Sequence, residues 1–210
     1  MKVELIDFAG GDLSVVNSAR VSFNKSTTTM EGRDVKLIHY LAKHRHDTPF
    51  RHNFVQLRCS VPLFLARQLM KHQAGLTWNE ESRRYVDNVP DFFKPDGWRK
   101  RPDDSIKQGS GGHHPYSPRW QRFYEDHVEN SIDLYRDMLR DNIAPEMARM
   151  VLPQSMMVNF IWSGNLLAFF HVYKLRSGEG AQEEAMVFAE LLKEAIEPEF
   201  PDSWAALEAR

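Results

Sequence analysis

The clearest strand in the sequence is Val55-Gln56-Leu57-Arg58-Cys59-Ser60-Val61. Apolar and polar side chains alternate along it, which predicts an extended strand with one buried face and one polar face. Pro62 comes next and suits the first position of a helix, because its φ angle is already helical and no partner is needed there for an N–H. We therefore expect a strand over 55–61 that leads directly into a helix over 63–72.

Outward from this strand, the apolar periodicities indicate more helix than strand. A short strand is expected over 2–8, and the apolar segment 156–162 allows either a buried strand or a helix. Long, Pro-rich segments without periodicity are usually loops, so 87–118 is expected to be a long loop excursion. Helices are expected over 12–19 with Asp12 as a possible cap, 33–46, 119–141, 144–153, 164–176 with Ser163 as cap, and 185–196.

These elements predict an α+β fold: one helix-rich domain over 1–210, in which long helices flank a small, curved, mainly antiparallel sheet. A content of 42% hydrophobic and 27% charged residues is typical of a soluble globular protein. The net charge of −2 argues against a nucleic-acid partner. No apolar run suits a signal peptide or a membrane span, and the single cysteine excludes an intrachain disulfide, so a cytoplasmic location is expected.

A strongly polar stretch, 71–85, follows the helix expected after Pro62. It reads Lys-His-Gln-Ala-Gly-Leu-Thr-Trp-Asn-Glu-Glu-Ser-Arg-Arg-Tyr. So many polar groups are costly to bury, which indicates a site for an anionic ligand rather than core. Arg83-Arg84 beside Ser82 suit phosphate binding, and Arg20 with Ser22, Arg149 and Arg176 are further cations beside apolar residues. Arg99-Lys100-Arg101, in contrast, is expected to be an exposed run.

Other kinds of site have weaker support. Cys59 lies on the apolar face of its strand, which favours packing over nucleophilic catalysis. The sequence has nine histidines but no His-Glu-x-x-His motif, so no metal is expected. Neither a Walker loop nor Gly-x-Gly-x-x-Gly occurs, so the two common nucleotide-binding loops are not indicated.

Ordered blocks along most of the chain carry a family resemblance. They are Ala19-Arg20-Val21-Ser22, Thr48-Pro49-Phe50-Arg51-His52, Pro62-Leu63-Phe64-Leu65-Ala66-Arg67-Gln68, Asn79-Glu80-Glu81-Ser82-Arg83-Arg84-Tyr85, Ala148-Arg149-Met150-Val151-Leu152-Pro153, Leu175-Arg176 and Ala181-Gln182-Glu183-Glu184. By these blocks the chain resembles the flavin-dependent thymidylate synthases. That family's signature begins Arg-His-Arg, with seven residues before its serine. Here Lys71-His72-Gln73 stand in those places, and eight residues separate Gln73 from Ser82.

The resemblance implies a role for each matching residue. Residues implied in FAD binding are Ser22, His52, Lys71, His72, Gln73, Glu80, Asn165 and His171. Residues implied in dUMP binding are Gln68, Glu80, Ser82, Arg84, Arg149 and Arg176. Catalytic roles are implied for Arg176, Ser82 and His52.

The implied reaction is the reductive methylation of dUMP to dTMP without an enzyme nucleophile. Methylenetetrahydrofolate supplies the carbon, NADPH reduces FAD, and FAD supplies the hydride. The resemblance also implies a homotetramer with active sites shared between subunits. Two alternatives stay open: a non-catalytic nucleotide- or RNA-binding protein of this fold that has lost efficient flavin binding through Lys71 and Gln73, and a histidine-based metal hydrolase.

Overall fold

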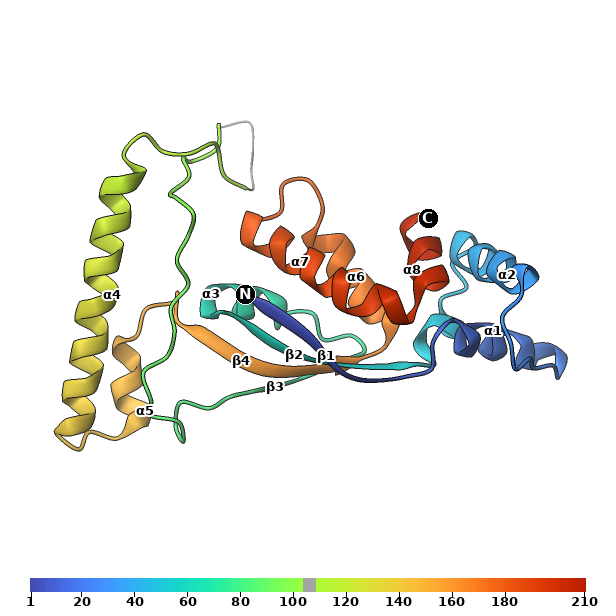
Figure 1. The fold of residues 1–210 in the computed structure, drawn as a ribbon, viewed down its shortest axis with the longest axis horizontal. Helices are drawn as coiled ribbons and strands as arrows, with labels where there is room; N and C mark the ends of the chain where they lie inside the picture. Colours follow the sequence, from blue (N-terminus) through green and yellow to red (C-terminus); the bar gives the residue numbers. More distant parts are fainter. Residues whose placement is uncertain (104–108) are drawn as a thin grey trace.

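The computed structural model describes residues 1–103 and 109–210. The fold is organised around one sheet (Figure 1). Its strands are β1 (Lys2–Ala9), β2 (Phe54–Pro62), β3 (Leu76–Glu80) and β4 (Met157–Gly164). They lie in the order β1-β2-β4-β3, and each neighbouring pair is antiparallel. The segment 156–162, which allowed either a strand or a helix, is thus a strand.

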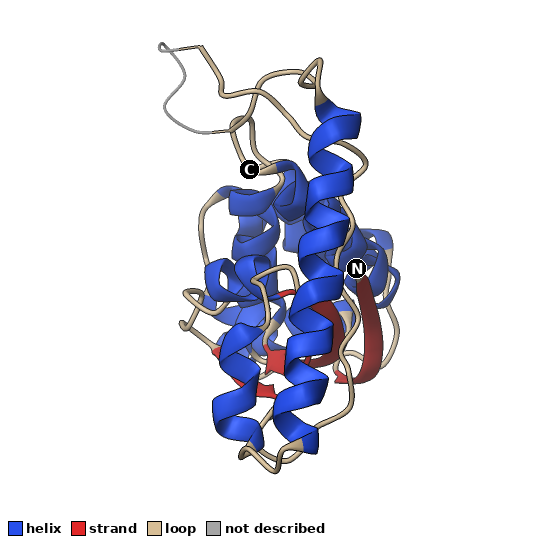
Figure 2. Ribbon diagram, turned by 90° about the vertical axis from the view of Figure 1, so that its left-hand side faces the viewer, coloured by secondary structure: helices blue, strands red, loops and turns tan. Residues whose placement is uncertain are grey.

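Helices make up most of the remaining regular structure, as Figure 2 shows. They are α1 (Asp12–Arg20), α2 (Gly32–Lys43), α3 (Leu63–Leu69), α4 (Ser117–Arg140), α5 (Pro145–Ala148), α6 (Leu166–Arg176), α7 (Glu183–Ile196) and α8 (Pro201–Glu208). In Figure 1, α6 and α7 lie over one side of the sheet, α1 and α2 stand at one end, and α4 and α5 stand at the other. The predicted α+β class, with helices around an antiparallel sheet, is confirmed.

The core lies between the sheet and the helices α3, α6 and α7, and it continues into buried residues of α1, α2 and α8. The alternating apolar residues of β2 are all buried, and Cys59 is 1% exposed, opposite Phe160 of β4. Burial raises the pKa of the Cys59 thiol to about 12, so the thiolate that nucleophilic attack requires is not available at neutral pH. The prediction that Cys59 is a packing residue is confirmed.

Two predicted helix caps are wrong. The Asp12 carboxylate does not cap its own helix; it accepts hydrogen bonds from the backbone N–H groups of Asp202 and Ser203, at 2.9 and 2.8 Å, at the start of α8. Ser163 lies within β4, and Asn165 caps α6 by accepting from the N–H of Ala168 at 3.0 Å. Asp12 makes a tertiary contact with α8 instead, and β4 extends over Ser163, so neither residue caps the helix that the sequence pattern assigned to it.

Two elements were missed. β3 lies within the polar stretch and is an edge strand, in which Leu76, Trp78 and Glu80 are half-buried while Thr77 and Asn79 are exposed. Helix α8 follows Pro198, where the last helix was expected to close.

Other elements differ from the prediction only in their bounds. Helix α3 ends at Leu69, short of the expected His72. In the expected loop 87–118, the described residues before α4 carry only two isolated bridges, and 104–108 lie outside the described residues.

The Asp12 contact leads to the first prediction. Asp12→Ala leaves two backbone N–H groups of α8 unpaired, one of them on the buried residue Ser203, and we expect it to lower the free energy of unfolding by about 1–2 kcal/mol. Urea denaturation measures this loss. Asp12→Asn keeps one acceptor oxygen and is expected to lose less. Equal stability of Asp12→Ala and the wild type would show that α8 does not depend on this cap.

Candidate functional site

The first candidate cavity lies at the end of α6. It has a volume of about 660 Å³, and its wall includes Gln68 of α3, Arg176 of α6 and the loop residue Gln182. The side-chain oxygen of Gln68 is buried and has no hydrogen-bond partner in the described part of the chain. A buried unpaired acceptor is costly. The cavity therefore offers a cation together with an acceptor that lacks a donor, which suits a polar ligand carrying both kinds of group.

His72 lies directly against this cavity's cation. The Nε–H group of Arg176 donates to Nε2 of His72 at 3.0 Å. Burial lowers the pKa of His72, and the Arg176 guanidinium and His171 lower it further. Burial also lowers the pKa of His171, and the Arg210 guanidinium adds to this effect. His72 is thus held toward its neutral form beside the Arg176 cation, and His171 is held toward its neutral form near the Arg210 cation.

The loop that carries His72 lies along α6. Gly75 has a φ of 76°, and a Cβ there would be 2.8 Å from Nδ2 of Asn165 and 3.2 Å from Cβ of Ala168. A larger residue would therefore clash with the start of α6 as well as being strained. Asn165, His171 and Arg176 all belong to α6 or its cap, and the loop 70–75 lies along this helix, with His72 against Arg176 and Gly75 against Asn165.

A second cavity, of about 460 Å³, contains Glu80 of β3 and Arg149, with Arg67 and Arg83 also in its wall. Burial raises the pKa of Glu80, while the indole N–H of Trp78, at 3.3 Å, and the Arg67 cation act in the opposite direction. Two predicted dUMP residues therefore meet here rather than beside Gln68 and Arg176.

The two arginines after Ser82 have different surroundings. Arg83 is 8% exposed, and its guanidinium is held by the backbone oxygen of Asn88 and by Glu81. Its Nη1 and Nη2 groups face protein acceptors, while the side chain still lines the second cavity, and its expected role in phosphate binding stays a prediction. Arg84 is exposed and pairs with Glu146 at 3.3 Å, and the Ser82 hydroxyl accepts from the Arg84 N–H at 3.3 Å. Arg84 and Ser82 thus stay accessible to a ligand.

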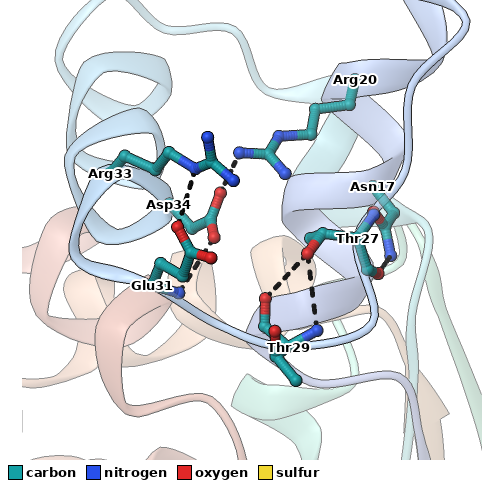
Figure 3. A network of polar contacts seen from close by, with 7 residues as sticks. All are labelled: Asn17, Arg20, Thr27, Thr29, Glu31, Arg33 and Asp34. Carbon is teal, nitrogen blue, oxygen red and sulfur yellow. Dashed lines mark hydrogen bonds and ion pairs between the residues drawn. The ribbon is translucent and has the colours of Figure 1, made fainter.

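A third cavity, of about 840 Å³, contains Ser22 and His52, two predicted FAD residues. Arg20 also lines it, but Figure 3 shows its guanidinium directed at the fully buried carboxylate of Asp34. Arg20 thus uses one Nη group in a buried ion pair, and its expected role in phosphate binding stays a prediction. Arg45 and Arg51 are further cations of this wall. Within the described residues, no carboxylate oxygen lies within 4.0 Å of either guanidinium.

The predicted site residues are therefore distributed over separate cavities of one chain. Gln68, Arg176 and His72 form one group, Glu80 and Arg149 a second, and Ser22 and His52 a third. Lys71 and Gln73 are exposed on the loop beside the first group.

One arginine of the first cavity was missed. Arg99, expected to be exposed, has a side chain only 20% exposed and binds Glu184 at 2.7 and 2.9 Å and Glu183 at 3.0 Å. Its Nε–H group donates to Ser110 at 2.7 Å. The pair Glu183-Glu184 was the only available sequence signal for a partner. Because protein acceptors engage Nε, Nη1 and Nη2, Arg99 shapes the wall rather than offering a free cation.

Residues 1–103 and 109–210 contain no group of three His, Cys, Asp or Glu side chains arranged to hold a metal ion. No helix there has the length and apolar character needed to cross a membrane.

Comparison with known proteins gives consistent matches. Residues 4–202 match the family described as thymidylate synthase complementing protein. A flavin-dependent thymidylate synthase of Thermosipho africanus is 35% identical over 188 residues, which cover 89% of this chain and 82% of the relative. The enzyme of that name from Thermus thermophilus is 34% identical over 206 residues, covering 98% of this chain and 75% of the relative.

Solved structures agree with the sequence matches. The crystal structure of the UMP/dUMP methylase PolB from Streptomyces cacaoi bound with 5-Br dUMP superposes with a TM-score of 0.88. It is 31% identical, and the match covers 99% of this chain and 94% of that one. Its structure with 5-Br UMP gives a TM-score of 0.86 at 30% identity, covering 99% and 93%. The chain therefore belongs to the thymidylate synthase complementing protein family.

Proposed function

We propose that this protein methylates C5 of dUMP to give dTMP, with methylenetetrahydrofolate as carbon donor and NADPH-reduced FAD as hydride source. The observation that carries this proposal is that Arg176 lines one cavity together with Gln68, whose side-chain oxygen has no partner in the described structure. A uracil ring has carbonyl oxygens that accept hydrogen bonds on either side of an N–H that donates. Guanidinium donors and an amide acceptor are complementary to that edge.

The chain's own residues account for activation without a covalent bond. Negative charge that develops on the uracil oxygens during methylation is stabilised by the Arg176 guanidinium, which lies in a partly buried site where such interactions are strong. Cys59 is buried in the core, so it is not the nucleophile. Ser82 and Arg84 provide accessible donors for a phosphate, as does Arg149 in the second cavity.

The third cavity and the loop 70–75 fit FAD by their chemistry. Arg45 and Arg51 suit a pyrophosphate, and Ser22 and His52 add polar contacts. His72, Asn165 and His171, with Lys71 and Gln73 beside them, supply polar groups near α6 for the ring system. Bound there, FAD would supply hydride, and the protein would orient it against the nucleotide.

The separation of these cavities supports a homotetramer with shared active sites. Residues assigned to one nucleotide line two different cavities, so one chain does not gather them around a single ligand. Each cavity also has a strongly exposed apolar side chain in its wall: Leu175 at 64% in the first, Met150 at 66% in the second and Phe23 at 77% in the third. A second copy that covers these side chains would bury their apolar surface, which favours association.

UMP is a second candidate substrate. Two solved structures that match this chain along nearly all of its length are of a UMP/dUMP methylase, bound with the 5-bromo analogue of either nucleotide. Uracil recognition by Gln68 and Arg176 is the same for both, since they differ only at the 2′ position of the sugar. The preference of the protein for dUMP or UMP is measured by the ratio of its kcat/KM values for the two nucleotides.

We expect the purified protein to be yellow, or to acquire the flavin absorbance bands after FAD is added, and to oxidise NADPH in a dUMP-dependent way. With methylenetetrahydrofolate present, dTMP should appear in the product mixture, and UMP should be compared in parallel. Nucleotide binding without any flavin spectrum would favour the non-catalytic alternative. Activity that a chelator removes and FAD does not affect would favour a metal hydrolase.

A further inference from the structure

The contact between His72 and Arg176 defines the protonation state of the histidine. Nε2 of His72 accepts a hydrogen bond from the Nε–H group of Arg176 at 3.0 Å. An imidazole nitrogen that accepts carries no proton, so His72 is neutral, with its proton on Nδ1. The lowered pKa of His72, caused first by burial and then by Arg176 and His171, agrees with this neutral form.

The loop that carries His72 is closely packed against the start of α6. A Cβ on Gly164 would be 2.4 Å from the carbonyl oxygen of Gly75, and a Cβ on Gly75 would be 2.8 Å from Nδ2 of Asn165. The loop 70–75 is therefore pressed against the start of α6, while Arg176 is the last residue of that helix. The backbone of the loop that carries His72 is thus anchored against the helix from which Arg176 extends.

An arginine side chain held at Nε loses much of its freedom. The guanidinium group is planar with its five N–H donors in a rigid fork, so fixing Nε fixes the directions of Nη1 and Nη2. The rotamer entropy of a free arginine would otherwise oppose ligand binding. Gln68 shares the cavity with Arg176 but forms no hydrogen bond with it in the described structure. The Nη groups are thus left for a ligand.

We propose that His72 is a positioning residue for Arg176: as a neutral acceptor of its Nε–H group, it aims the two Nη groups at the pyrimidine carbonyl oxygens in the Gln68 cavity. The role is additional to any contact of His72 with flavin. The identity of the ligand rests on the proposed function, while the orientation of Arg176 does not. His72 acts through Arg176 and forms no bond with the pyrimidine.

This arrangement makes nucleotide binding depend on pH. His72 faces Arg176 and His171 of α6 and neighbours Lys71 in its own loop, and the groups around His171 are Arg210, Asp47, Arg51 and Lys174. Protonation of His72 removes the acceptor and places a second cation against Arg176. Because the pKa of His72 lies below its ordinary value, the neutral form dominates at neutral pH, and nucleotide affinity falls only when the pH drops through that lowered pKa.

A matched pair of variants tests the proposal. The side-chain oxygen of glutamine reaches the position of Nε2, whereas that of asparagine reaches only the position of Nδ1. In His72→Gln, we expect the ¹⁵N–¹H signal of the Arg176 Nε–H group, assigned with Arg176→Lys, to stay protected from exchange. In His72→Asn, the protection should be lost. The affinity for dUMP, measured by calorimetry on the full-length protein, should stay within about threefold in His72→Gln and fall about tenfold or more in His72→Asn.

Two controls keep the outcomes separate. In an Arg176→Lys background, His72→Asn should cause little further loss of affinity, because a residue acting through Arg176 shows strong coupling in a double-mutant cycle. The affinity of His72→Gln should also lose the acid-dependent decline seen in the wild type, whereas His171→Gln should retain it. Unchanged Nε–H protection and dUMP affinity in a folded His72→Asn protein would overturn the proposal. A different outcome concerns the proposed function alone. If the Arg176 Nε–H group is protected as expected but the wild type binds neither dUMP nor UMP, the proposed function is wrong and the orientation of Arg176 by His72 stands.

Discussion

Arg176→Ala is expected to lower kcat/KM for dUMP by about 100- to 1000-fold, the usual effect of removing one donor that stabilises developing charge. The free energy of unfolding should change by less than about 1 kcal/mol, because Arg176 stands at the end of α6 and its side chain is only partly buried. Its one side-chain hydrogen bond in the described structure goes to His72. Steady-state kinetics and urea denaturation on the same preparation measure both quantities.

Lys174→Ala is the matched control for this prediction. Lys174 lies in the same last turn of α6, is exposed, and does not line the cavity with Gln68. Lys174→Ala also removes one favourable positive charge from the C-terminal end of the helix, which lowers the free energy of unfolding by about a few tenths of a kcal/mol. It should leave kcat/KM nearly unchanged. If Arg176→Ala lowers stability in proportion to activity, its guanidinium is structural and the proposed role of Arg176 is wrong.

The elements predicted best were those with strong local periodicity. The alternation over 55–61 gives β2, and the amphipathic pattern over 119–141 gives α4, with bounds close to those expected. β3 was missed because its half-buried face is partly polar, and Glu80 resembles a ligand residue as much as a strand residue. Its alternation of Leu76, Trp78 and Glu80 was a usable signal. Trp78 stacks on Phe160 of β4, a partner far away in the sequence.

The cations show the limit of sequence reasoning at the site. Arg20, Arg83 and Arg99 differ little in sequence from Arg149 and Arg176, yet protein acceptors engage the first three. Asp34 of α2 and Glu184 of α7 lie 14 and 85 residues from the arginines that they bind, so no local pattern identifies them. Glu81 and Asn88, in contrast, are close to Arg83 in the sequence. The contact of His72 with Arg176 likewise depends on how the loop 70–75 packs against α6. The spacing of residues in the sequence does not predict this packing.

Asp34→Ala is expected to cause the largest loss of stability, about 3 kcal/mol, measured by urea denaturation. Its side chain is fully buried, pairs with Arg20 of α1, and accepts from the Glu31 N–H at 3.0 Å (Figure 3). The variant leaves Arg20, whose side chain is only 18% exposed, without its counter-charge, and this is what makes removing one partner of a buried pair costly. It also removes the link between α1 and the start of α2.

Variants of the same network separate the charge from the cap. Asp34→Asn keeps the shape and the acceptor for Glu31 but removes the charge, so a loss close to that of Asp34→Ala would assign the effect to Arg20. Arg33→Ala breaks only an exposed pair with Glu31, with side chains 69% and 54% exposed, and should cost less than about 0.5 kcal/mol. If Asp34→Ala costs no more than Arg33→Ala, the buried pair contributes nothing and Arg20 is free to contact a ligand in the third cavity. The conclusion that the Arg20 guanidinium is held by Asp34 would then be wrong.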